Sequence, residues 1–354
     1  MIIKCLKQFQ YHLLHWYHRT ARKLPWRKTK VPYKIWISEI MLQQTQVQTV
    51  IPYYTKWVRR FPTVRSLANA RFSEILILWA GLGYYRRAQM LHQTAKLLCA
   101  KYQGRLPQTR DGLNKLPGIG PYTAGAIASI AFGENAAILD GNIKRILARI
   151  FAISHDIQSP RTINHLWKLS ASLVPKSNPG DFNQAMMELG AIICLPDTPR
   201  CHQCPVTMFC EARRLNRETD FPFRRNRIPV KKVRQVALVI YNSNHEILIK
   251  RQPDNGRWGG LWTFPFGDNR KEITNELNID NQSLKQIMTL RFGFTKYQVQ
   301  LKVYENQLPK TDKRNNERPR LKNSHLRWVK AVKLISYPFP APHRQIANQL
   351  NHAK

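Results

Sequence analysis

Four cysteines lie close together near the middle of the chain: Cys194, Cys201, Cys204 and Cys210. Thiols at this spacing, C-x6-C-x2-C-x5-C, form either a metal site or a small disulfide knot. The opening MIIKCLKQFQYHLLHWYHR has no apolar core of signal-peptide length, so we expect a reducing compartment, which favours a metal. Four thiolates suit a cubane iron–sulfur cluster. Zinc stays open, although zinc ribbons usually bring two C-x2-C pairs and this run has one.

Two carboxyl groups occupy positions where they could do acid–base chemistry. Glu39 lies among large apolar residues in PYKIWISEIMLQQTQV, which predicts either a surface stripe on a helix or an apolar pocket. Burial in a pocket would raise its pKa and make it a general acid near neutral pH. Asp140 stands directly before a predicted helix in LDGNIKRILAR. On this segment alone we favour a helix N-cap; the alternative is a carboxylate at the mouth of a cleft, kept ionised by its cap contact.

Two glycine-containing segments are typical of nucleic-acid contacts. In LPGIGPYTAGAIASIAF, Gly118 and Gly120 flank a tight turn, and Pro121 suits the first turn of the next helix. Together with the preceding DGLNKL this predicts a helix–hairpin–helix at about 111–132, whose backbone N–H groups can approach a phosphate. GLGYYRRAQ, residues 81–89, is suited to aromatic insertion beside phosphates. The alternatives are a plain helix corner with glycine caps and core aromatics at a helix start.

The composition favours a polyanionic partner. The 354 residues include 57 Lys and Arg against 21 Asp and Glu, a formal charge of +36. This excess of positive charge is spread along the chain. It favours nucleic acid as the partner over the alternative, a charge that only serves solubility or reflects a generally basic proteome. No apolar run approaches the ~20 residues that a membrane helix needs, so we expect no membrane association.

The periodicity of apolar residues predicts two domains of different class. Residues 1–220 read as helices, with helical spacing at 33–42, 66–82, 86–102, 123–132 and 142–153. Thr45 and Gln48 have the spacing of a capping box. Residues 221–234, FPFRRNRIPVKKVR, read as a linker. Residues 235–354 read as an α+β domain, with strand-like runs at 235–241, 246–251, 291–305 and 323–330 and a closing helix at 341–352.

Taken in order, these segments resemble the MutY-type adenine DNA glycosylases of the helix–hairpin–helix superfamily. The matching runs extend from about Leu24 to Cys210 and are LPWR, PYKIWISEIMLQQTQV, GLGYYRRA, LPGIGPYTAGA, LDGNIKRILAR, FNQAMMELGAIIC and the cysteine loop. RWGGLWTFP, residues 257–265, is similar to the second domain of that family, which is Nudix-like. The resemblance implies a multi-domain protein: an all-α helix–hairpin–helix glycosylase domain with a [4Fe–4S] loop at 194–210, then an α+β Nudix-like domain at 235–354.

The resemblance also implies an activity. The family removes adenine mispaired with 8-oxoguanine or guanine during base excision repair, after flipping the base out of the duplex. Glu39 matches its general acid, and Asp140 matches the carboxylate that stabilises an oxocarbenium-like sugar or attacks it, which is the two-carboxylate logic of glycoside cleavage. Tyr122 stands where lyase-type relatives place a catalytic lysine. Because a phenol forms no Schiff base, we expect a monofunctional enzyme. Asn142 matches a helper near the sugar.

Binding residues follow from the same resemblance. Arg27 and Gln184 match adenine-pocket residues. The residues that wedge the duplex near 8-oxoguanine are matched by Gln44, Thr45, Leu82 and Tyr84. The cysteine run matches the family's cluster ligands in order and spacing, which implies a [4Fe–4S] cofactor. We expect a monomer that binds double-stranded DNA containing adenine:8-oxoguanine or adenine:guanine mispairs, in the bacterial cytoplasm with the nucleoid as the default compartment.

The second domain departs from the family pattern in two ways. FGDNRKEITNELNID offers only Glu272 and Glu276 where Nudix hydrolases carry a dense metal-binding set, so we expect no nucleotide hydrolysis. The family reads 8-oxoguanine through a Phe-Ser-His loop, and this chain has Phe294, Thr295 and Lys296 there.

Two rival interpretations were weighed against the family resemblance. One rival, a pyrimidine-lesion glycosylase–lyase, is disfavoured by Tyr122 and by the second domain. The other, a silent iron–sulfur DNA-binding module, is disfavoured because Glu39 and Asp140 are both present.

Overall fold

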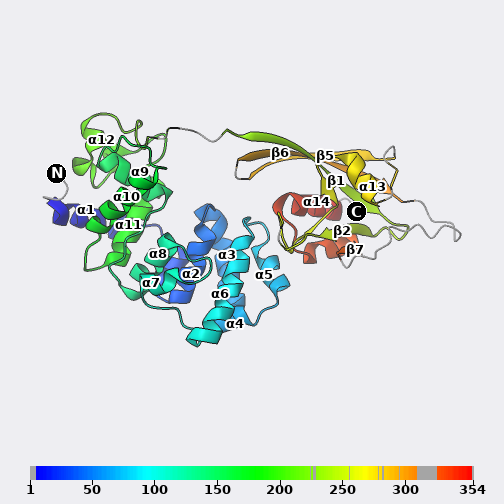
Figure 1. Cartoon of the computed structure of the whole chain (residues 1–354), viewed down its shortest axis with the longest axis horizontal. Coiled ribbons are helices and arrows are strands. Elements are labelled where there is room, and N and C mark those ends of the chain that lie inside the picture. The colour runs from blue at the N-terminus through cyan, green and yellow to red at the C-terminus, as the bar shows by residue number, and fades with distance from the viewer. Residues whose placement is uncertain are drawn as a thin grey trace. The chain divides into compact units, whose positions relative to one another are not determined.

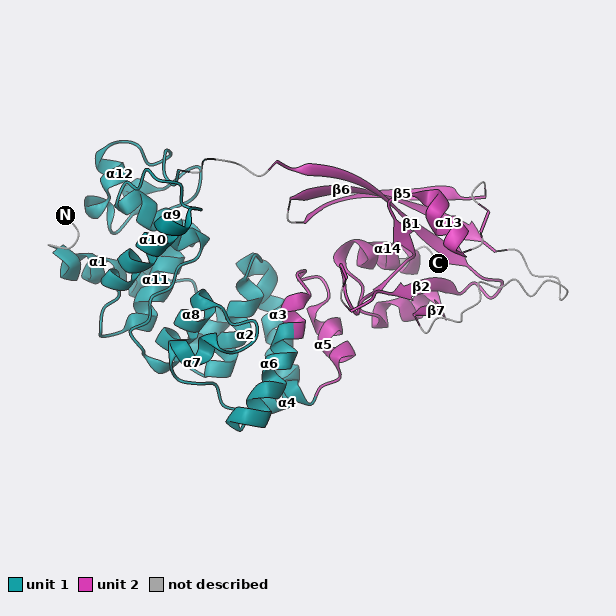
Figure 2. Cartoon of the chain, viewed as in Figure 1, with its two compact units in different colours: residues 1–69, 90–227 teal, residues 70–89, 228–354 magenta. Residues whose placement is uncertain are grey.

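The computed structural model describes residues 5–223, 225, 229–254, 256–277, 279–280, 283–294, 296–308 and 325–352. Thr295, a predicted lesion contact, and part of the predicted linker lie outside these residues. The chain divides into two compact units, coloured separately in Figure 2. Unit 1 comprises residues 1–69 and 90–227, and unit 2 comprises residues 70–89 and 228–354. The domain boundaries at 220 and 235 stay a prediction.

Unit 1 is built from helices (Figure 1). Its α-helices are α1 (Leu6–Thr20), α2 (Pro32–Leu42), α3 (Val47–Arg60), α4 (Val64–Ala68), α6 (Arg86–Tyr102, whose first turn belongs to unit 2), α7 (Arg110–Asn114), α8 (Pro121–Phe132), α9 (Gly141–Ile150), α10 (Pro160–Leu173), α11 (Pro179–Ile192) and α12 (Glu211–Arg214). Short 3-10 turns lie at η2 (Pro25–Lys28), η3 (Cys201–Gln203) and η4 (Thr207–Phe209). The all-α class predicted for the first domain is confirmed.

Helix α2 is the element that places a carboxyl group in the interior. Trp36, Ile37, Ile40 and Met41 are each at most 3% exposed, and they lie on different sides of the helix. A helix that is apolar all round belongs in a core. Glu39 therefore has no solvent-facing side to occupy and is buried with its neighbours.

Two local predictions for residues 1–220 are wrong. The run at 66–82 is not one helix, because α4 ends at Ala68 and α5 (Phe72–Trp79) begins after a break. The capping box at Thr45 does not form: α3 has Gln46 as its N-cap without a side-chain cap bond. The Thr45 hydroxyl instead donates to the carbonyl oxygen of Gln43 at 3.3 Å, a local side-chain bond that competes with capping.

Unit 2 contains α5 and a mixed sheet (Figures 1 and 2). The strands are β1 (Lys231–Tyr241), β2 (Ile247–Arg251), β3 (Trp262–Thr263), β4 (Phe266–Gly267), β5 (Lys285–Phe294), β6 (Tyr297–Gln307) and β7 (Leu326–Val329). Their order is β3-β2-β1-β6-β5, with β4 also paired to β1 and β7 to β2. Strands β1 and β6 are parallel along their whole length, and β5 and β6 are antiparallel. The helical elements are α13 (Arg270–Leu277), η5 (Ala331–Ser336) and α14 (Ala341–His352), so the α+β class is confirmed.

At strand β1 the sheet packs against a hydrophobic core on each face. Alternate residues of β1 belong to different cores, Ala237 and Val239 to one and Leu238 and Ile240 to the other, as the period of a strand requires. β1 begins at Lys231, inside the predicted linker. The alternating run at 291–305 is a hairpin of β5 and β6 and not one strand. Among the described residues, no helix is both long and apolar enough to cross a membrane.

Candidate active site and cysteine loop

Glu39 is the buried acid of unit 1. Its side chain lies on α2 with the residue 4% exposed, and its Oε2 accepts a hydrogen bond of 2.9 Å from the Tyr122 hydroxyl on α8. Burial raises the pKa of Glu39 to about 7, although the Tyr122 hydrogen bond lowers it; Asp140 raises it further and Arg27 lowers it. Of the two positions considered for Glu39, the buried apolar pocket is therefore the observed one. With this pKa the carboxyl is about half protonated at neutral pH.

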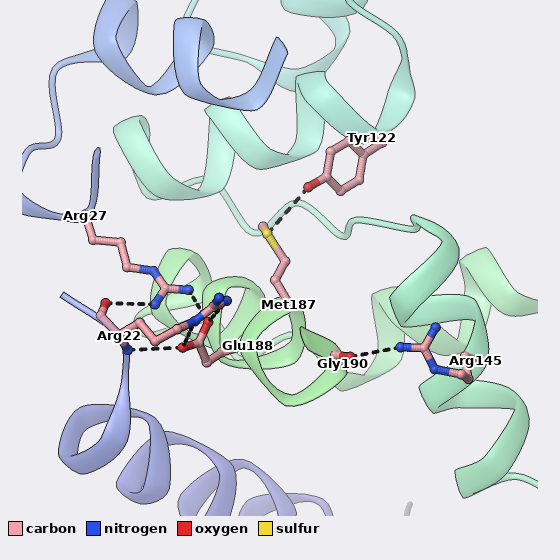
Figure 3. A network of polar contacts seen from close by, with 7 residues as sticks. All are labelled: Arg22, Arg27, Tyr122, Arg145, Met187, Glu188 and Gly190. Carbon is pink, nitrogen blue, oxygen red and sulfur yellow. Dashed lines mark hydrogen bonds and ion pairs between the residues drawn. The ribbon is translucent and has the colours of Figure 1, made fainter. Parts of the chain in front are cut away.

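Tyr122 is held as a neutral phenol. Burial and the nearby carboxylates Glu39 and Asp140 raise its pKa well above the ordinary value. Its hydroxyl also lies 3.4 Å from the Sδ atom of Met187 on α11 (Figure 3). The phenol is thus fixed between α2 and α11 and donates its hydrogen bond to Glu39.

Asp140 is the N-cap of α9, as predicted. Its Oδ1 accepts from the Ile143 N–H at 2.8 Å, and its Oδ2 accepts from the Asn142 amide at 3.2 Å. Burial raises the pKa of Asp140, while these hydrogen bonds and the charge of Arg145 act to lower it. The cap contact was expected to keep Asp140 ionised, but its pKa is raised because burial outweighs the hydrogen bonds and Arg145.

Arg145 supports the cap from the other side. One guanidinium nitrogen, Nη2, donates to the Gly190 carbonyl oxygen at 2.9 Å (Figure 3). It also donates to Asn142 Oδ1 at 2.9 Å, and Nε donates to the Cys194 carbonyl oxygen at 2.8 Å. Gly190 permits this approach, since a Cβ atom there would lie 2.7 Å from the Cβ atom of Asn142. Asn142, a predicted site residue, is therefore fixed between Asp140 and Arg145.

Glu188 was missed by sequence reasoning. Its side chain on α11 is fully buried and pairs with Arg22 and Arg27, each at 2.8 Å from Oε2 (Figure 3). The backbone N–H and Nε of Arg22 also donate to Oε1, at 3.0 and 2.8 Å. Burial raises the pKa of Glu188, but the hydrogen bonds from both arginines outweigh it and hold the pKa at about 2. A lone carboxylate in the apolar run FNQAMMELGAIIC was the available signal.

Glu188 orients the predicted pocket residue Arg27. A second donor of Arg27, Nη1, bonds the Arg22 carbonyl oxygen at 3.1 Å, and its guanidinium lies 5.4 Å from the Tyr17 ring centroid. Gln184, another predicted pocket residue, is half-buried one turn before Glu188 on the same helix. Spacing of four residues places Gln184 and Glu188 on one face of α11.

The four cysteine thiols of the 194–210 loop line one largely apolar cavity together with Ile146, Arg149, Leu189 and Val206. Burial raises the pKa of Cys204 to about 12, and burial together with Glu218 raises that of Cys201 to about 11. Arg149, which is 2% exposed, donates through Nη1 to the Cys194 Sγ atom at 3.3 Å and also to loop carbonyl oxygens. Within the described ranges, no three His, Cys, Asp or Glu side chains are placed to hold a single metal ion.

Two family comparisons match separate parts of the chain. The HhH-GPD superfamily base excision DNA repair protein family matches residues 37–172, and the NUDIX domain family matches residues 236–349. The adenine DNA glycosylase of Buchnera aphidicola subsp. Baizongia pistaciae is 42% identical over 286 residues, which is 80% of each chain. The human adenine DNA glycosylase is 38% identical over 310 residues, which is 73% of this chain and 57% of the human one. This chain belongs to the adenine DNA glycosylases.

Two solved structures are similar in fold to part of this chain. A thermostable thymine-DNA glycosylase is 33% identical with a TM-score of 0.56, covering 60% of this chain and 98% of its own. An endonuclease III–DNA covalent complex is 22% identical with a TM-score of 0.51, covering 61% and 96%, and shows the fold. As an adenine DNA glycosylase, the protein is a DNA N-glycosylase of base excision repair, and its substrate is DNA.

The helix–hairpin–helix of this adenine DNA glycosylase comprises α7 and α8. Gly118 lies in the turn at φ +75°, and a Cβ atom there would lie 2.6 Å from the Cβ atom of Met90. Gly120 is the N-cap of α8, where an added Cβ would meet no atom within 4 Å, and Pro121 is the first helical residue. The open backbone at Gly120 suits an approaching phosphate.

The predicted wedge residues are not all at the surface. Gln44 is exposed with φ 55°, and Tyr84 is 42% exposed with φ 46°. Leu82, by contrast, is buried. The loop is held by Arg87, which sequence reasoning missed: its Nη2 donates to the carbonyl oxygens of Leu82 and Gly83 at 3.2 Å, and its guanidinium lies 5.5 Å from the Tyr84 ring centroid.

The predicted lesion reader lies at the turn between β5 and β6 of unit 2. Phe294 ends β5, is half-buried, and stacks on Tyr297 with ring centroids 5.2 Å apart. Lys296 is exposed. Elsewhere in the unit, Glu276 of α13 pairs with Lys250; the expectation that the domain hydrolyses no nucleotide stays a prediction.

Proposed function

We propose that the chain removes adenine paired with 8-oxoguanine or guanine, and that it does so without cutting the strand. The observation that carries the proposal is the arrangement around Glu39, a buried carboxyl with a pKa of about 7 that is bonded to the neutral phenol of Tyr122 and lies near Asp140. A protonatable acid beside a second carboxylate is what N-glycosidic cleavage of a purine requires.

Glu39 serves as the general acid in this proposal. Adenine is a poor leaving group until a ring nitrogen is protonated, so the protonated Glu39 donates that proton as the bond to the sugar breaks. Because Glu39 is 4% exposed, the adenine has to leave the base stack to reach it. Extrusion costs less for a mispaired base than for a paired one, which contributes to selectivity.

Asp140 serves as the ionised partner. The departing adenine takes the electron pair of the glycosidic bond, and the sugar becomes cationic; a carboxylate at hydrogen-bonded distance from Ile143 N–H and Asn142 is fixed to stabilise that charge or to bond to it. Water then adds to the sugar. Tyr122 cannot form a Schiff base, so the abasic strand stays intact, apart from adventitious reaction with a lysine such as Lys144.

The cysteine loop is proposed to hold a [4Fe–4S] cluster. Four thiols around one cavity fit its donor set, and the Arg149 guanidinium is placed to donate to the Cys194 sulfur. A bound cluster would brace the loop that carries Arg200 and His202, two polar residues that could then contact DNA. Iron and sulfide analysis of anaerobically prepared protein tests this: stoichiometric zinc without iron would contradict it.

Unit 2 is proposed to read the base opposite the adenine, through Phe294, Thr295 and Lys296, in a monomeric enzyme on double-stranded DNA. Thr295→Ala should narrow the preference for 8-oxoguanine over guanine, since a hydroxyl contact contributes about 1 kcal/mol. Lys296→Ala should weaken binding of both duplexes equally and lower the slope of log affinity against log salt by about 0.9, the share of one phosphate contact.

Single-turnover assays decide the proposal. Duplexes with adenine opposite 8-oxoguanine, guanine or thymine, and one with an oxidised pyrimidine, are incubated with excess protein and quenched with or without alkali. We expect adenine release from the first two duplexes, strand breaks only after alkali, and no release with Glu39→Gln at near-normal duplex binding. Asp181→Asn on α11 is the matched carboxyl control. Pyrimidine release or alkali-independent breaks would favour a glycosylase–lyase instead.

A further inference from the structure

An arginine in unit 2 lies between two aromatic rings. The guanidinium carbon of Arg257 is 4.0 Å from the ring centroid of Trp258 and 4.0 Å from that of Phe294. The Phe294 ring in turn stacks on the Tyr297 ring, with a centroid distance of 5.2 Å and an interplanar angle of 30°. Arg257 therefore joins the loop after β2 to the last residue of β5 and, through it, to the first residue of β6.

The hydrogen bonds of Arg257 do not account for its position. Nη1 donates to Gln235 Oε1 at 3.0 Å, and Gln235 in turn donates to Asp268 at 2.8 Å. Nη2 is buried and has no hydrogen-bond partner in the described part of the chain. Burial lowers the pKa of Arg257 to about 10, so the group is still a cation at neutral pH. Aromatic ring faces attract a cation most strongly when it is removed from water. The two rings are therefore the main interaction that offsets the desolvation of the Arg257 guanidinium.

The backbone beneath the stack is also unusual. Trp258 has φ +63°, a left-handed conformation that bulky residues rarely adopt. Its ring is held by Phe266 and His343, at centroid distances of 5.0 and 5.1 Å. A bulky residue stays in this conformation only where its surroundings fix it. The Trp258 ring on which Arg257 stacks is therefore held in place. The ring on the other side of Arg257, Phe294, is the last residue of strand β5.

We propose that Arg257 is a positioning residue for lesion reading. By stacking on Phe294 it fixes the end of β5 at the β5–β6 hairpin, and so sets the preference for 8-oxoguanine over guanine opposite adenine. This inference rests on the proposed role of unit 2 as reader. Arg257 acts through Phe294 and needs no contact of its own with the lesion.

The first experiment measures the hairpin directly, in the full-length protein with its cofactor. Amide hydrogen exchange is followed on a peptide covering residues 291–298 in Arg257→Met and Arg257→Lys. We expect exchange to be about thirtyfold faster in Arg257→Met, the factor that corresponds to a desolvated cation–π contact, and less accelerated in Arg257→Lys. The matched control is Arg327→Met, which removes a guanidinium 5.4 Å from the Trp262 ring in the same unit. Unchanged exchange in both Arg257 variants overturns the proposal.

The second experiment measures the preference itself. The ratio of single-turnover rates on the 8-oxoguanine and guanine duplexes should fall about fivefold in Arg257→Met and stay at the wild-type value in Arg327→Met. If Thr295→Ala lowers the ratio and Arg257→Met does not, the inference fails while the reader assignment stands. If neither lowers it, unit 2 is not the reader. Should Arg257→Met fail to fold, Arg257→Lys decides by the same two measurements, because it keeps the charge and loses the planar stack.

Discussion

The pH dependence of adenine release is the sharpest test of the acid assigned to Glu39. A group with a pKa of about 7 is half protonated at pH 7, and its protonated fraction falls about tenfold for each further pH unit. From pH 7 to pH 9 the rate should therefore fall about fiftyfold if only protonated Glu39 supports cleavage. Between pH 5 and pH 6 the rate should hardly change, because Glu39 is almost fully protonated there.

The assay is single-turnover release from the adenine:8-oxoguanine duplex with the protein well below its dissociation constant. Rates under this condition follow kcat/KM and report the pKa of the free enzyme. A rate that stays constant from pH 6 to pH 9, or that rises, would refute the general-acid assignment. Substantial release by Glu39→Gln at neutral pH would refute it independently.

The same pKa makes a prediction about stability, with a definite sign. The pKa of Glu39 is raised from 4.5 to about 7 by burial, so the buried carboxyl costs nothing well below pH 4.5 and its cost grows as the pH rises to 7. At 1.36 kcal/mol per pKa unit, the full cost above pH 7 is about 3 kcal/mol. Glu39→Gln removes this cost. We expect the inactive variant to be more stable than wild type at pH 8, by up to about 3 kcal/mol in the unfolding free energy of unit 1, with a difference below about 1 kcal/mol at pH 5.

Three further variants test neighbouring contacts. Tyr122→Phe removes the hydrogen bond that lowers the pKa of Glu39, so the falling limb of the pH–rate profile should move to higher pH; movement to lower pH would contradict the contact. Glu188→Gln leaves two arginines without their carboxylate and should cost about 3 to 5 kcal/mol by chemical denaturation, whereas the half-exposed Asp181→Asn should stay within about 0.5 kcal/mol. Cys201→Ser should lower iron and sulfide content and weaken duplex binding; a full complement of both would argue against Cys201 as a ligand.

The parts of the site that were predictable are the local ones. The N-cap at Asp140 needs only a side chain that reaches the N–H of Ile143 three residues later, and the burial of Glu39 follows from the apolar residues around it in one helix. The group around Glu188 was not predictable in this way. Its partners Arg22 and Arg27 lie 166 and 161 residues away in sequence, and no periodicity encodes a contact at that separation.

The misread strand in unit 2 has a comparable cause. Alternation of apolar and polar residues specifies the two faces of a strand but not where the chain reverses. The reversal between Phe294 and Tyr297 has none of the Asn-Gly or Asp-Gly pairs that mark tight hairpins. Residues 294–296 are nevertheless proposed to read the base opposite the adenine, and the family resemblance, not the alternation of residue types, pointed to them. The contact between Arg257 and Phe294 could not be predicted from the sequence either, because only the fold brings these two distant residues together.

Three carboxyl groups of unit 1 differ in pKa because they differ in burial and in partners. Glu188 receives two guanidinium groups and a backbone N–H, and its pKa is about 2. Asp140 receives a backbone N–H and an amide, with the charge of Arg145 behind them. Glu39 accepts a hydrogen bond from the Tyr122 phenol, but burial has the larger effect and its pKa is about 7. Glu188 is therefore an anion at neutral pH. Glu39, by contrast, can both carry a proton and release it at that pH. That difference, and not the mere presence of carboxyl groups in the interior, is what assigns the acid to α2.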